Sequence, residues 1–182
     1  LIPPLPEAAL ARLEARFPAR RIGVGDAVVS VRECGAGAGL PLVCLHGIGS
    51  GSASWLETAQ LLASDARLLA WDAPGYGDST PLPMSAPLGA DYAQRLAALL
   101  DALGIERCVL VGHSLGALMA APAARDTRRV AALVLLSPAQ GYGAPGREAE
   151  RVRVQAERIA GLDALGIAGL AWTVGALHAE WR

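Results

Sequence analysis

The sequence predicts an α/β fold built on a mostly parallel, doubly wound sheet with an N-terminal antiparallel hairpin. From residue 42 onward, four short runs are continuously apolar instead of alternating between apolar and polar residues. Helix-forming segments separate these runs, and this order is typical of parallel strands buried on both faces. Ahead of them, two strand-like segments flank Gly25-Asp26, a dipeptide that favours a tight hairpin turn.

Composition narrows the range of function classes. A chain of 182 residues with 53% hydrophobic residues is long enough for one continuous core. The net charge is −1 and there is no basic tract, so we expect neither nucleic acid nor a membrane surface as a partner. No apolar run approaches the ~20 residues of a membrane-spanning helix. We therefore expect a cytoplasmic protein. Its three cysteines should be structural residues without a disulfide framework, with Cys44 and Cys108 in the core.

The first elements follow from local patterns. Pro6 suits the start of a short helix that has Leu10, Leu13 and Phe17 on one face. Segments 21–24 and 27–32 form the predicted hairpin, with Cys34 near a strand end.

The next elements alternate between strand and helix. Residues 42–45 form a predicted strand, and Ser54 with Glu57 suggests a capping box for a helix over 55–62. Residues 67–71 form the next strand.

The strongest helix pattern lies at residues 91–103, where leucines and Tyr92 form one stripe before a stop at Gly104. A buried strand at 108–111 and a helix from Leu115 follow, and Pro122 should shorten that helix.

The last predicted strand is a buried one at 130–136. After Pro138 the pattern becomes helical or irregular, so we divide the chain into a core, 1–139, and a second part, 140–182. A helix over 148–159 should turn Ala149, Val152, Ala156 and Ile159 inward and leave an Arg/Glu face in solvent.

The most informative motif is Gly112-His113-Ser114-Leu115-Gly116, at the junction of a predicted strand and a predicted helix. A sharp turn there would lift the Ser114 hydroxyl above the sheet edge, and glycines at 112 and 116 would let strand and helix approach closely. The alternative is that Ser114 only caps the following helix.

A second motif, His46-Gly47, directly follows the strand at 42–45. Acyl transfer places negative charge on the former carbonyl oxygen, and two backbone N–H groups can stabilise it. The candidate donors are Ile48, in this loop, and Leu115, the residue after the serine.

A third motif runs from Trp71 to Ser79 and is dense in turn-forming residues. Asp72 has the chemistry of a catalytic acid, but an aspartate before Ala-Pro-Gly fits better as an acceptor for the amides of its own turn.

These three motifs, in this order, resemble the α/β-hydrolase superfamily over roughly residues 20–145. The resemblance implies that Ser114 is a nucleophile on an elbow, that Ile48 and Leu115 form an oxyanion hole, and that residues 140–182 begin a helical cap. It also implies supporting roles for His46, Gly47, Gly112 and Gly116. The segment 47–55 is similar to enol-lactone hydrolases and to the ring-fission-product hydrolases of aromatic degradation.

The resemblance also implies a catalytic acid and a catalytic histidine, each after a later strand of the sheet. This sequence contains neither of those two strands. His46 belongs to the oxyanion loop, and the ring of His113 should point to the other side of the elbow from Ser114. His178 follows the serine in the predicted cap and is a weak candidate base. The incomplete fold has three explanations: a truncated or partial chain, which we favour, a complementing chain, or a protein without a triad.

Two function classes follow. The first is a serine hydrolase of ester, lactone or related acyl bonds, or of the carbon–carbon bond of ring-fission products, acting on a small molecule. The second is a non-catalytic binding protein or inactive remnant of the same fold. Neither a metal-ligand spacing nor a dinucleotide-binding motif is present, so no cofactor is expected. A homo-oligomer or a complementing chain would cover the sheet edge that the incomplete core exposes.

Overall fold

The computed structural model describes residues 7–126, 128–139, 145–157, 159–161 and 163–164. One compact unit ends at Pro138, and a second begins at Ala139. The elements of the first unit, in chain order, are α1 (Glu7–Arg16), β1 (Ala19–Val24), β2 (Ala27–Cys34), β3 (Leu42–Leu45), η1 (Ser52–Trp55), α2 (Leu56–Leu62), β4 (Leu68–Trp71), α3 (Gly89–Ala102), β5 (Cys108–His113), α4 (Leu115–Ala123) and β6 (Val130–Leu136).

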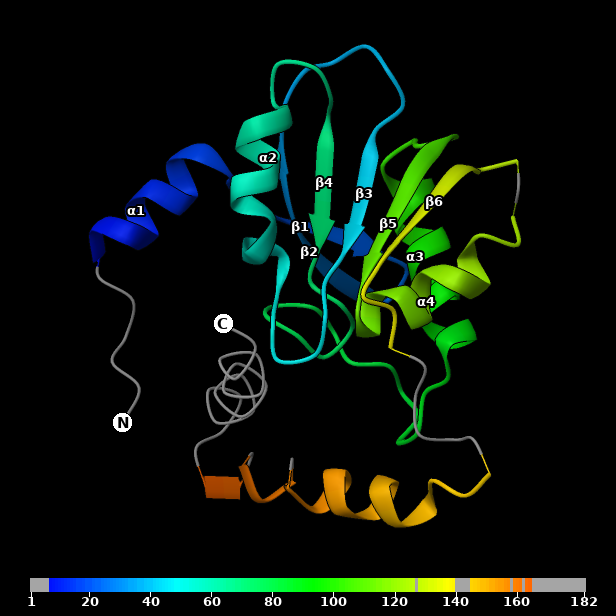
Figure 1. Ribbon diagram of the computed structural model, residues 1–182. Coiled ribbons are helices and arrows are strands. Elements are labelled where there is room, and N and C mark those ends of the chain that lie inside the picture. The colour runs from blue at the N-terminus through cyan, green and yellow to red at the C-terminus, as the bar shows by residue number, and fades with distance from the viewer. Residues whose placement is uncertain (1–6, 127, 140–144, 158, 162, 165–182) are drawn as a thin grey trace. The chain divides into compact units, whose positions relative to one another are not determined.

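The first unit is built on one six-stranded sheet in the order β1-β2-β4-β3-β5-β6 (Figure 1). β2 pairs antiparallel with both β1 and β4, whereas β3, β4, β5 and β6 are mutually parallel. The hairpin turns at Gly25, whose φ of 62° is a conformation that suits glycine. The predicted fold class and the N-terminal hairpin are therefore confirmed.

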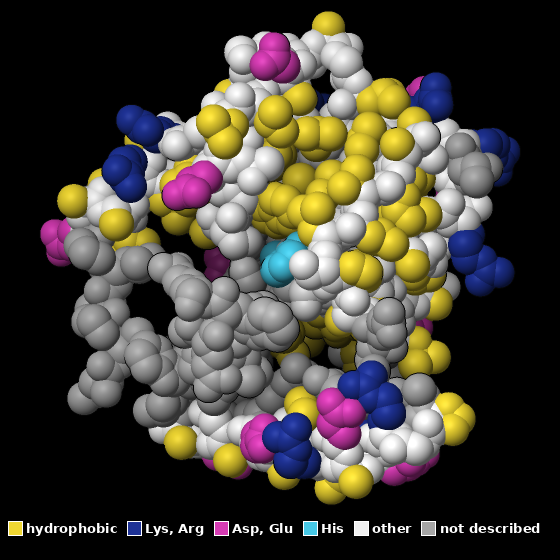
Figure 2. Space-filling model, in the orientation of Figure 1, with side chains coloured by type: hydrophobic (Ala, Val, Ile, Leu, Met, Phe, Trp, Pro, Cys, Tyr) yellow, Lys and Arg dark blue, Asp and Glu magenta, His cyan; other side chains and the backbone are white. Residues whose placement is uncertain are grey.

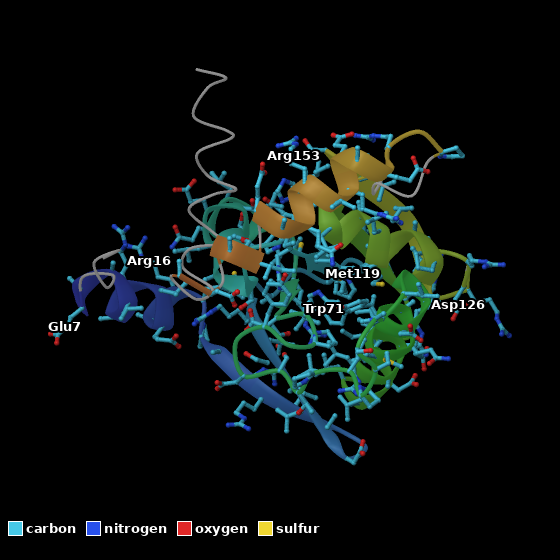
Figure 3. The ribbon with its side chains drawn as sticks, turned by 90° about the horizontal axis from the view of Figure 1, so that it is seen from below. Glu7, Arg16, Trp71, Met119, Asp126 and Arg153 are labelled. Atoms are coloured by element: carbon cyan, nitrogen blue, oxygen red, sulfur yellow. The ribbon has the colours of Figure 1, made fainter. Side chains whose placement is uncertain are left out.

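Helices cover the two faces of this sheet in pairs. α3 and α4 supply Leu96, Leu99 and Met119 to a cluster that includes Trp71 and Leu110 from the strands. Figure 3 shows Trp71 and Met119 near the centre of the packed side chains, and both are fully buried. Burial of this kind is the main stabilising contribution to such a core.

The opposite face carries α1 and α2. Leu13 and Phe17 from the α1 region pack with Trp55 and Ala59 against the other side of the strands. Cys44 is buried in this second cluster, and burial raises the pKa of its thiol to about 12. A thiol held in the neutral form is a weak nucleophile, which agrees with a packing role for Cys44.

Some local predictions are wrong. Ser54 and Glu57 do not form a capping box, because residues 52–55 make a 3₁₀ turn and the Ser54 hydroxyl donates to the carbonyl of Gly51. Leu10 is 44% exposed, so the apolar face of α1 buries Leu13 but not Leu10. Pro122 does shorten α4, which ends at the following residue.

Two further errors concern burial. β6 is a strand as predicted, but it lies at the edge of the sheet and most of its residues are exposed. In the second unit, residues 148–157 are helical with Arg147–Glu150 and Arg153–Glu157 ion pairs, yet Val152 is 61% exposed instead of inward. Ala149, Ala156 and Ile159 are exposed as well. No helix among the described residues has the length and hydropathy to span a membrane.

Candidate active site

Ser114 occupies a sharp turn between β5 and α4. Its backbone φ of 53° and ψ of −113° lie in a region that residues with a Cβ seldom adopt. The Ser114 N–H donates to the carbonyl oxygen of Leu136, at 3.0 Å, so the end of β6 holds the turn in place. The Ser114 side chain makes no capping hydrogen bond to α4, which argues against the capping alternative.

Close contacts between backbone segments explain why glycine occupies positions 112 and 116 of the turn. A Cβ on Gly116 would lie 2.2 Å from the carbonyl oxygen of Leu45, at the end of β3. A Cβ on Gly112 would lie 2.7 Å from the carbonyl oxygen of Gly116. Both distances are far below van der Waals contact with backbone atoms, so only glycine allows α4 to start this close to the sheet. The crowding expected from the sequence is therefore confirmed.

The loop after β3 lies against the same turn. A Cβ on Gly47 would lie 3.1 Å from the Cβ of Ser114 and 3.1 Å from Nδ1 of His113. Ile48 follows Gly47 in a turn and is half-buried. Leu115 is the first residue of α4, and the first N–H groups of a helix have no partner inside it. The two candidate oxyanion donors thus come from segments that contact each other at Ser114.

His46 connects this loop to the segment after β4. Its Nε2 accepts the N–H of Ala73 at 3.0 Å, so its Nδ1 carries the proton and donates to the carbonyl of Gly47 at 2.8 Å. The ring also makes an edge contact with Tyr76 at 4.8 Å between centroids. His46 is buried, and this burial lowers its pKa. A neutral imidazole with both nitrogens engaged holds the loop and has no free position for proton transfer from Ser114.

The ring of His113 lies beside Gly47, in the loop after β3. A Cβ on Gly47 would be 3.1 Å from the Nδ1 atom of this ring and 3.5 Å from its Cε1 atom, and the residue is exposed. The prediction that the ring points to the other side of the elbow from the Ser114 hydroxyl stays a prediction.

Asp72 is a hydrogen-bond acceptor, as predicted, but its partners differ from the predicted ones. Its carboxylate accepts the Ser52 N–H at 2.7 Å and the Ser30 hydroxyl at 2.8 Å, and neither group belongs to its own turn. It therefore ties the turn after β4 to the segment after β3 and to β2. Gly77 lies close to this carboxylate, because a Cβ there would be 2.9 Å from the Oδ2 atom.

Two polar residues of this network were missed at the sequence level. Ser79 is buried, donates its hydroxyl to the carbonyl of Asp72 and accepts the N–H of Ser30. Ser30 is itself buried. A lone serine inside the apolar run Val28-Val29-Ser30-Val31 is the available signal, because a buried hydroxyl requires a partner.

Residues 41–156 match the alpha/beta hydrolase fold family. The chain belongs to this family. A 2-hydroxy-6-oxononadienedioate/2-hydroxy-6-oxononatrienedioate hydrolase from Pseudomonas putida is 35% identical over 136 residues, which cover 72% of this chain and 47% of that protein. The dihydrolipoyllysine-residue acetyltransferase component of an acetoin cleaving system, also from Pseudomonas putida, is 35% identical over 128 residues, 69% of this chain and 34% of that protein.

Solved structures agree with this assignment. The crystal structure of E-2-(acetamidomethylene)succinate hydrolase superposes with a TM-score of 0.58 at 33% identity, over 64% of this chain and 43% of that one. This α/β-hydrolase chain thus spans half or less of the length of these relatives.

The described part of this α/β-hydrolase does not contain a complete triad around Ser114. His46 has both nitrogens engaged, and no hydrogen bond joins the Ser114 hydroxyl to another described side chain. His178, the candidate base in this sequence, lies outside the described residues. Nor do the described residues bring three or more His, Cys, Asp or Glu side chains together as metal ligands.

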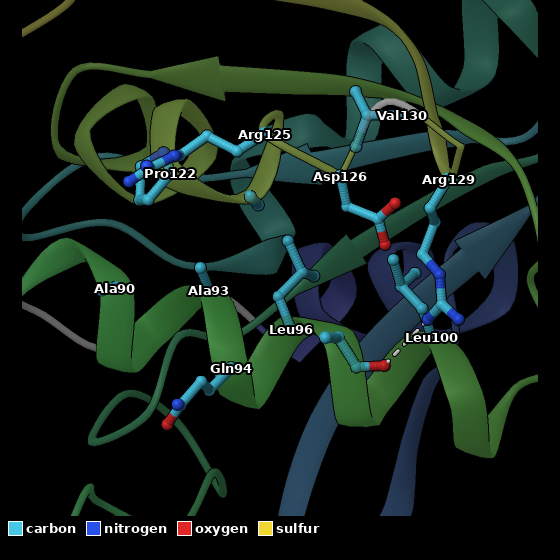
Figure 4. A pocket seen from close by; sticks show the side chains of 12 residues that line it. Ala90, Ala93, Gln94, Leu96, Leu100, Pro122, Arg125, Asp126, Arg129 and Val130 are labelled. Atoms are coloured by element: carbon cyan, nitrogen blue, oxygen red, sulfur yellow. Dashed lines mark hydrogen bonds between the residues drawn. The ribbon is translucent and has the colours of Figure 1, made fainter.

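A separate pocket of about 290 Å³ lies between α3 and the C-terminal end of α4 (Figure 4). Ala93, Leu96 and Pro122 line it, and Arg129 at its rim binds Asp101. Ser114 is at the opposite, N-terminal end of α4. This pocket is therefore distinct from the candidate active site.

Proposed function

We propose that this α/β-hydrolase chain carries the nucleophile of a serine hydrolase, with Ser114 attacking ester, lactone or related acyl carbonyls. The observation that carries the proposal is the strained turn at Ser114, held against Gly47 of the oxyanion loop. Strained backbone of this kind is tolerated where the surrounding structure enforces it, and it is concentrated at functional sites.

The proposed reaction proceeds through an acyl-enzyme. The Ser114 oxygen attacks the carbonyl carbon while its proton passes to a base, and the carbonyl oxygen becomes an oxyanion. The N–H groups of Ile48 and Leu115 would stabilise that charge, and the N-terminus of α4 adds a favourable dipole. The intermediate then expels the alcohol, which takes the proton, and water later releases the acid and restores Ser114.

The base and its orienting acid are proposed to come from beyond the described residues, either from a longer polypeptide or from a complementing chain. His178 is the candidate within this sequence. His46 is excluded as the base by its two hydrogen bonds.

A second substrate class is favoured by one comparison. The Pseudomonas putida relative is named as a hydrolase of 2-hydroxy-6-oxononadienedioate. The same serine and oxyanion loop could serve carbon–carbon bond cleavage in such a ring-fission product. We propose a small-molecule substrate in the cytoplasm and no cofactor on the basis of composition and motifs alone.

The test is covalent labelling with a fluorophosphonate probe, read by intact mass and by peptide mapping. We expect one adduct at Ser114, its loss in Ser114→Ala, and its retention in Ser64→Ala, which changes an exposed serine. Turnover of an activated ester should follow the same pattern. Equal labelling of Ser114→Ala, or a folded protein that forms no adduct when the sequence or chain that supplies the base is present, would contradict the proposal and favour a non-catalytic binding protein.

A further inference from the structure

A further pocket lies between α3 and the turn of the β1–β2 hairpin. It has a volume of about 350 Å³ and is lined by the hairpin turn, by the segment before α3 and by α3 itself. Val24 and Asp26 come from the turn, Leu82 and Met84 from the segment, and Arg95 from the helix. Small-molecule sites have volumes of roughly 300–1,000 Å³, so this pocket suits a small ligand.

Hydrogen bonds and core packing fix the walls of this pocket. The Thr80 hydroxyl accepts the Val28 N–H at 3.0 Å, and the Thr80 N–H donates to the Val28 carbonyl at 2.9 Å. These two bonds hold the segment that leads to Leu82 against β2. On the other side, α3 is anchored by Leu96 and Leu99, which are buried in the core cluster. The pocket is therefore preformed in the folded chain.

Arg95 brings an unsatisfied charged donor to this pocket. The Nη1 atom of its guanidinium is buried and has no hydrogen-bond partner among the described residues. Asp91 lies one helical turn ahead, but its carboxylate accepts the Leu88 N–H at 2.7 Å and leaves Arg95 Nη1 without an acceptor. A charged donor that is withdrawn from water without an acceptor is costly, so an acceptor oxygen beside Arg95 would stabilise the protein.

The other walls limit the charge and polarity of a ligand. One carboxylate can pair with Arg95, but a second negative charge would have no cationic partner in the pocket and would face Asp26 and Asp91. Leu82, Pro83 and Met84 give the pocket an apolar side. In Figure 2, by contrast, hydrophobic side chains gather over the strands, and most charged side chains lie toward the margins of the view. The pocket beside Arg95 combines a single cation with apolar walls.

We propose that this pocket binds a small monocarboxylate with an apolar chain. The carboxylate accepts hydrogen bonds from the Arg95 guanidinium, whose planar donors match its two oxygens. The chain lies against Leu82 and Met84, where its burial from water is favourable. The site is separate from Ser114, which precedes α4, and it does not depend on whether Ser114 is catalytic.

The experiment titrates the full 182-residue chain with hexanoate and follows the NMR shifts of backbone amides. We expect saturable shifts at Gly25 and Ala98, two lining residues, with a Kd of about 1 mM. Hexanamide has the same chain without the charge and should bind about tenfold more weakly. Adipate has the same six carbons and a second carboxylate, and it should also bind more weakly than hexanoate.

Three variants test the assigned roles. Arg95→Gln should weaken hexanoate binding by about tenfold. The matched control, Arg12→Gln, changes an exposed arginine of α1 and should leave binding unchanged. Asp26→Asn, at an exposed position of the hairpin turn, should reduce the preference for hexanoate over adipate. Circular dichroism checks each fold, and the comparison of hexanoate with hexanamide needs only the wild type if Arg95→Gln folds poorly.

Four results would overturn the proposal. The first is the absence of saturable hexanoate binding up to about 20 mM. The second is equal binding of hexanoate and hexanamide, and the third is undiminished hexanoate binding by a folded Arg95→Gln variant. The fourth is a set of shifts confined to amides around Ser114, which would place the carboxylate at the candidate active site instead.

Discussion

The backbone N–H of Ser114 donates to the carbonyl oxygen of Leu136, 3.0 Å away. This bond joins the candidate nucleophile to the last residue of the edge strand. The turn at Ser114 is therefore held from three sides: by β6 through this bond, by β3 through the close approach of Gly116, and by the loop at Gly47. Four predictions follow from these contacts and from those of His46 and Asp72.

Gly116→Ala should strongly destabilise the fold, because its Cβ would meet backbone atoms of Leu45 at 2.2 Å and 2.6 Å. Neither backbone segment can move without disturbing the sheet, so we expect a loss of about 3 kcal/mol or more in the free energy of unfolding. Chemical denaturation measures it. Gly23→Ala is the control, since a Cβ there meets nothing within 4 Å. Equal stability of the two variants would contradict the packing at the elbow.

Gly47→Ala should reduce the reactivity of Ser114 while leaving most of the fold intact. The new methyl group would lie 3.1 Å from both His113 Nδ1 and Ser114 Cβ, so the loop must shift by a few tenths of an ångström. We expect labelling by the fluorophosphonate probe to slow by about tenfold, because small displacements of oxyanion donors are costly. Adding His113→Ala to Gly47→Ala removes one of the two contacts and should restore part of the rate. No effect of Gly47→Ala on labelling would argue against this loop as part of the site.

His46 should make stability depend on pH in the mildly acidic range. Burial lowers its pKa in the folded state from an ordinary value of 6.5, so the unfolded chain binds a proton more readily than the folded one. The free energy of unfolding should therefore fall as pH drops below about 6.5, until the folded-state pKa is reached. Urea titrations between mildly acidic and neutral pH measure this slope, and His46→Gln should flatten it. An unchanged slope in His46→Gln would assign the effect to another group.

Asp72→Asn should destabilise the protein without removing the reactivity of Ser114. The carboxylate accepts hydrogen bonds from Ser52 and Ser30 through different oxygens, and an amide offers only one acceptor oxygen. We expect a loss of about 1–2 kcal/mol in the free energy of unfolding. The matched variant Asp78→Asn changes an exposed carboxylate and should be neutral. If Asp72→Asn abolished labelling while remaining folded, Asp72 would have a role in the chemistry.

The order of elements could be predicted because short-range patterns determine it. Continuous apolar runs, the turn at Gly25 and the stripe on α3 each follow from spacing along the chain, and all are found in the structure. Burial was harder to predict, because an apolar run such as β6 looks the same at the centre and at the edge of a sheet. Which strands become neighbours depends on contacts distant in sequence.

The candidate site likewise combines features that the local sequence predicts with features that depend on contacts between distant segments. The motif around Ser114 predicted a strand, a turn and a helix, because glycine spacing is local information. The partners of Asp72 and the position of the His113 ring depend on how separate loops meet, and no pattern near either residue encodes that.

The backbone conformation of Ser114 also bears on how this chain can change over evolutionary time. A residue with a Cβ at φ 53° and ψ −113° costs of the order of 1–3 kcal/mol in stability, and glycine would relieve most of it. A single substitution, Ser114→Gly, is thus expected to make the protein more stable while removing the hydroxyl. A lineage with no further use for that hydroxyl would thus have an easy path to glycine at this position.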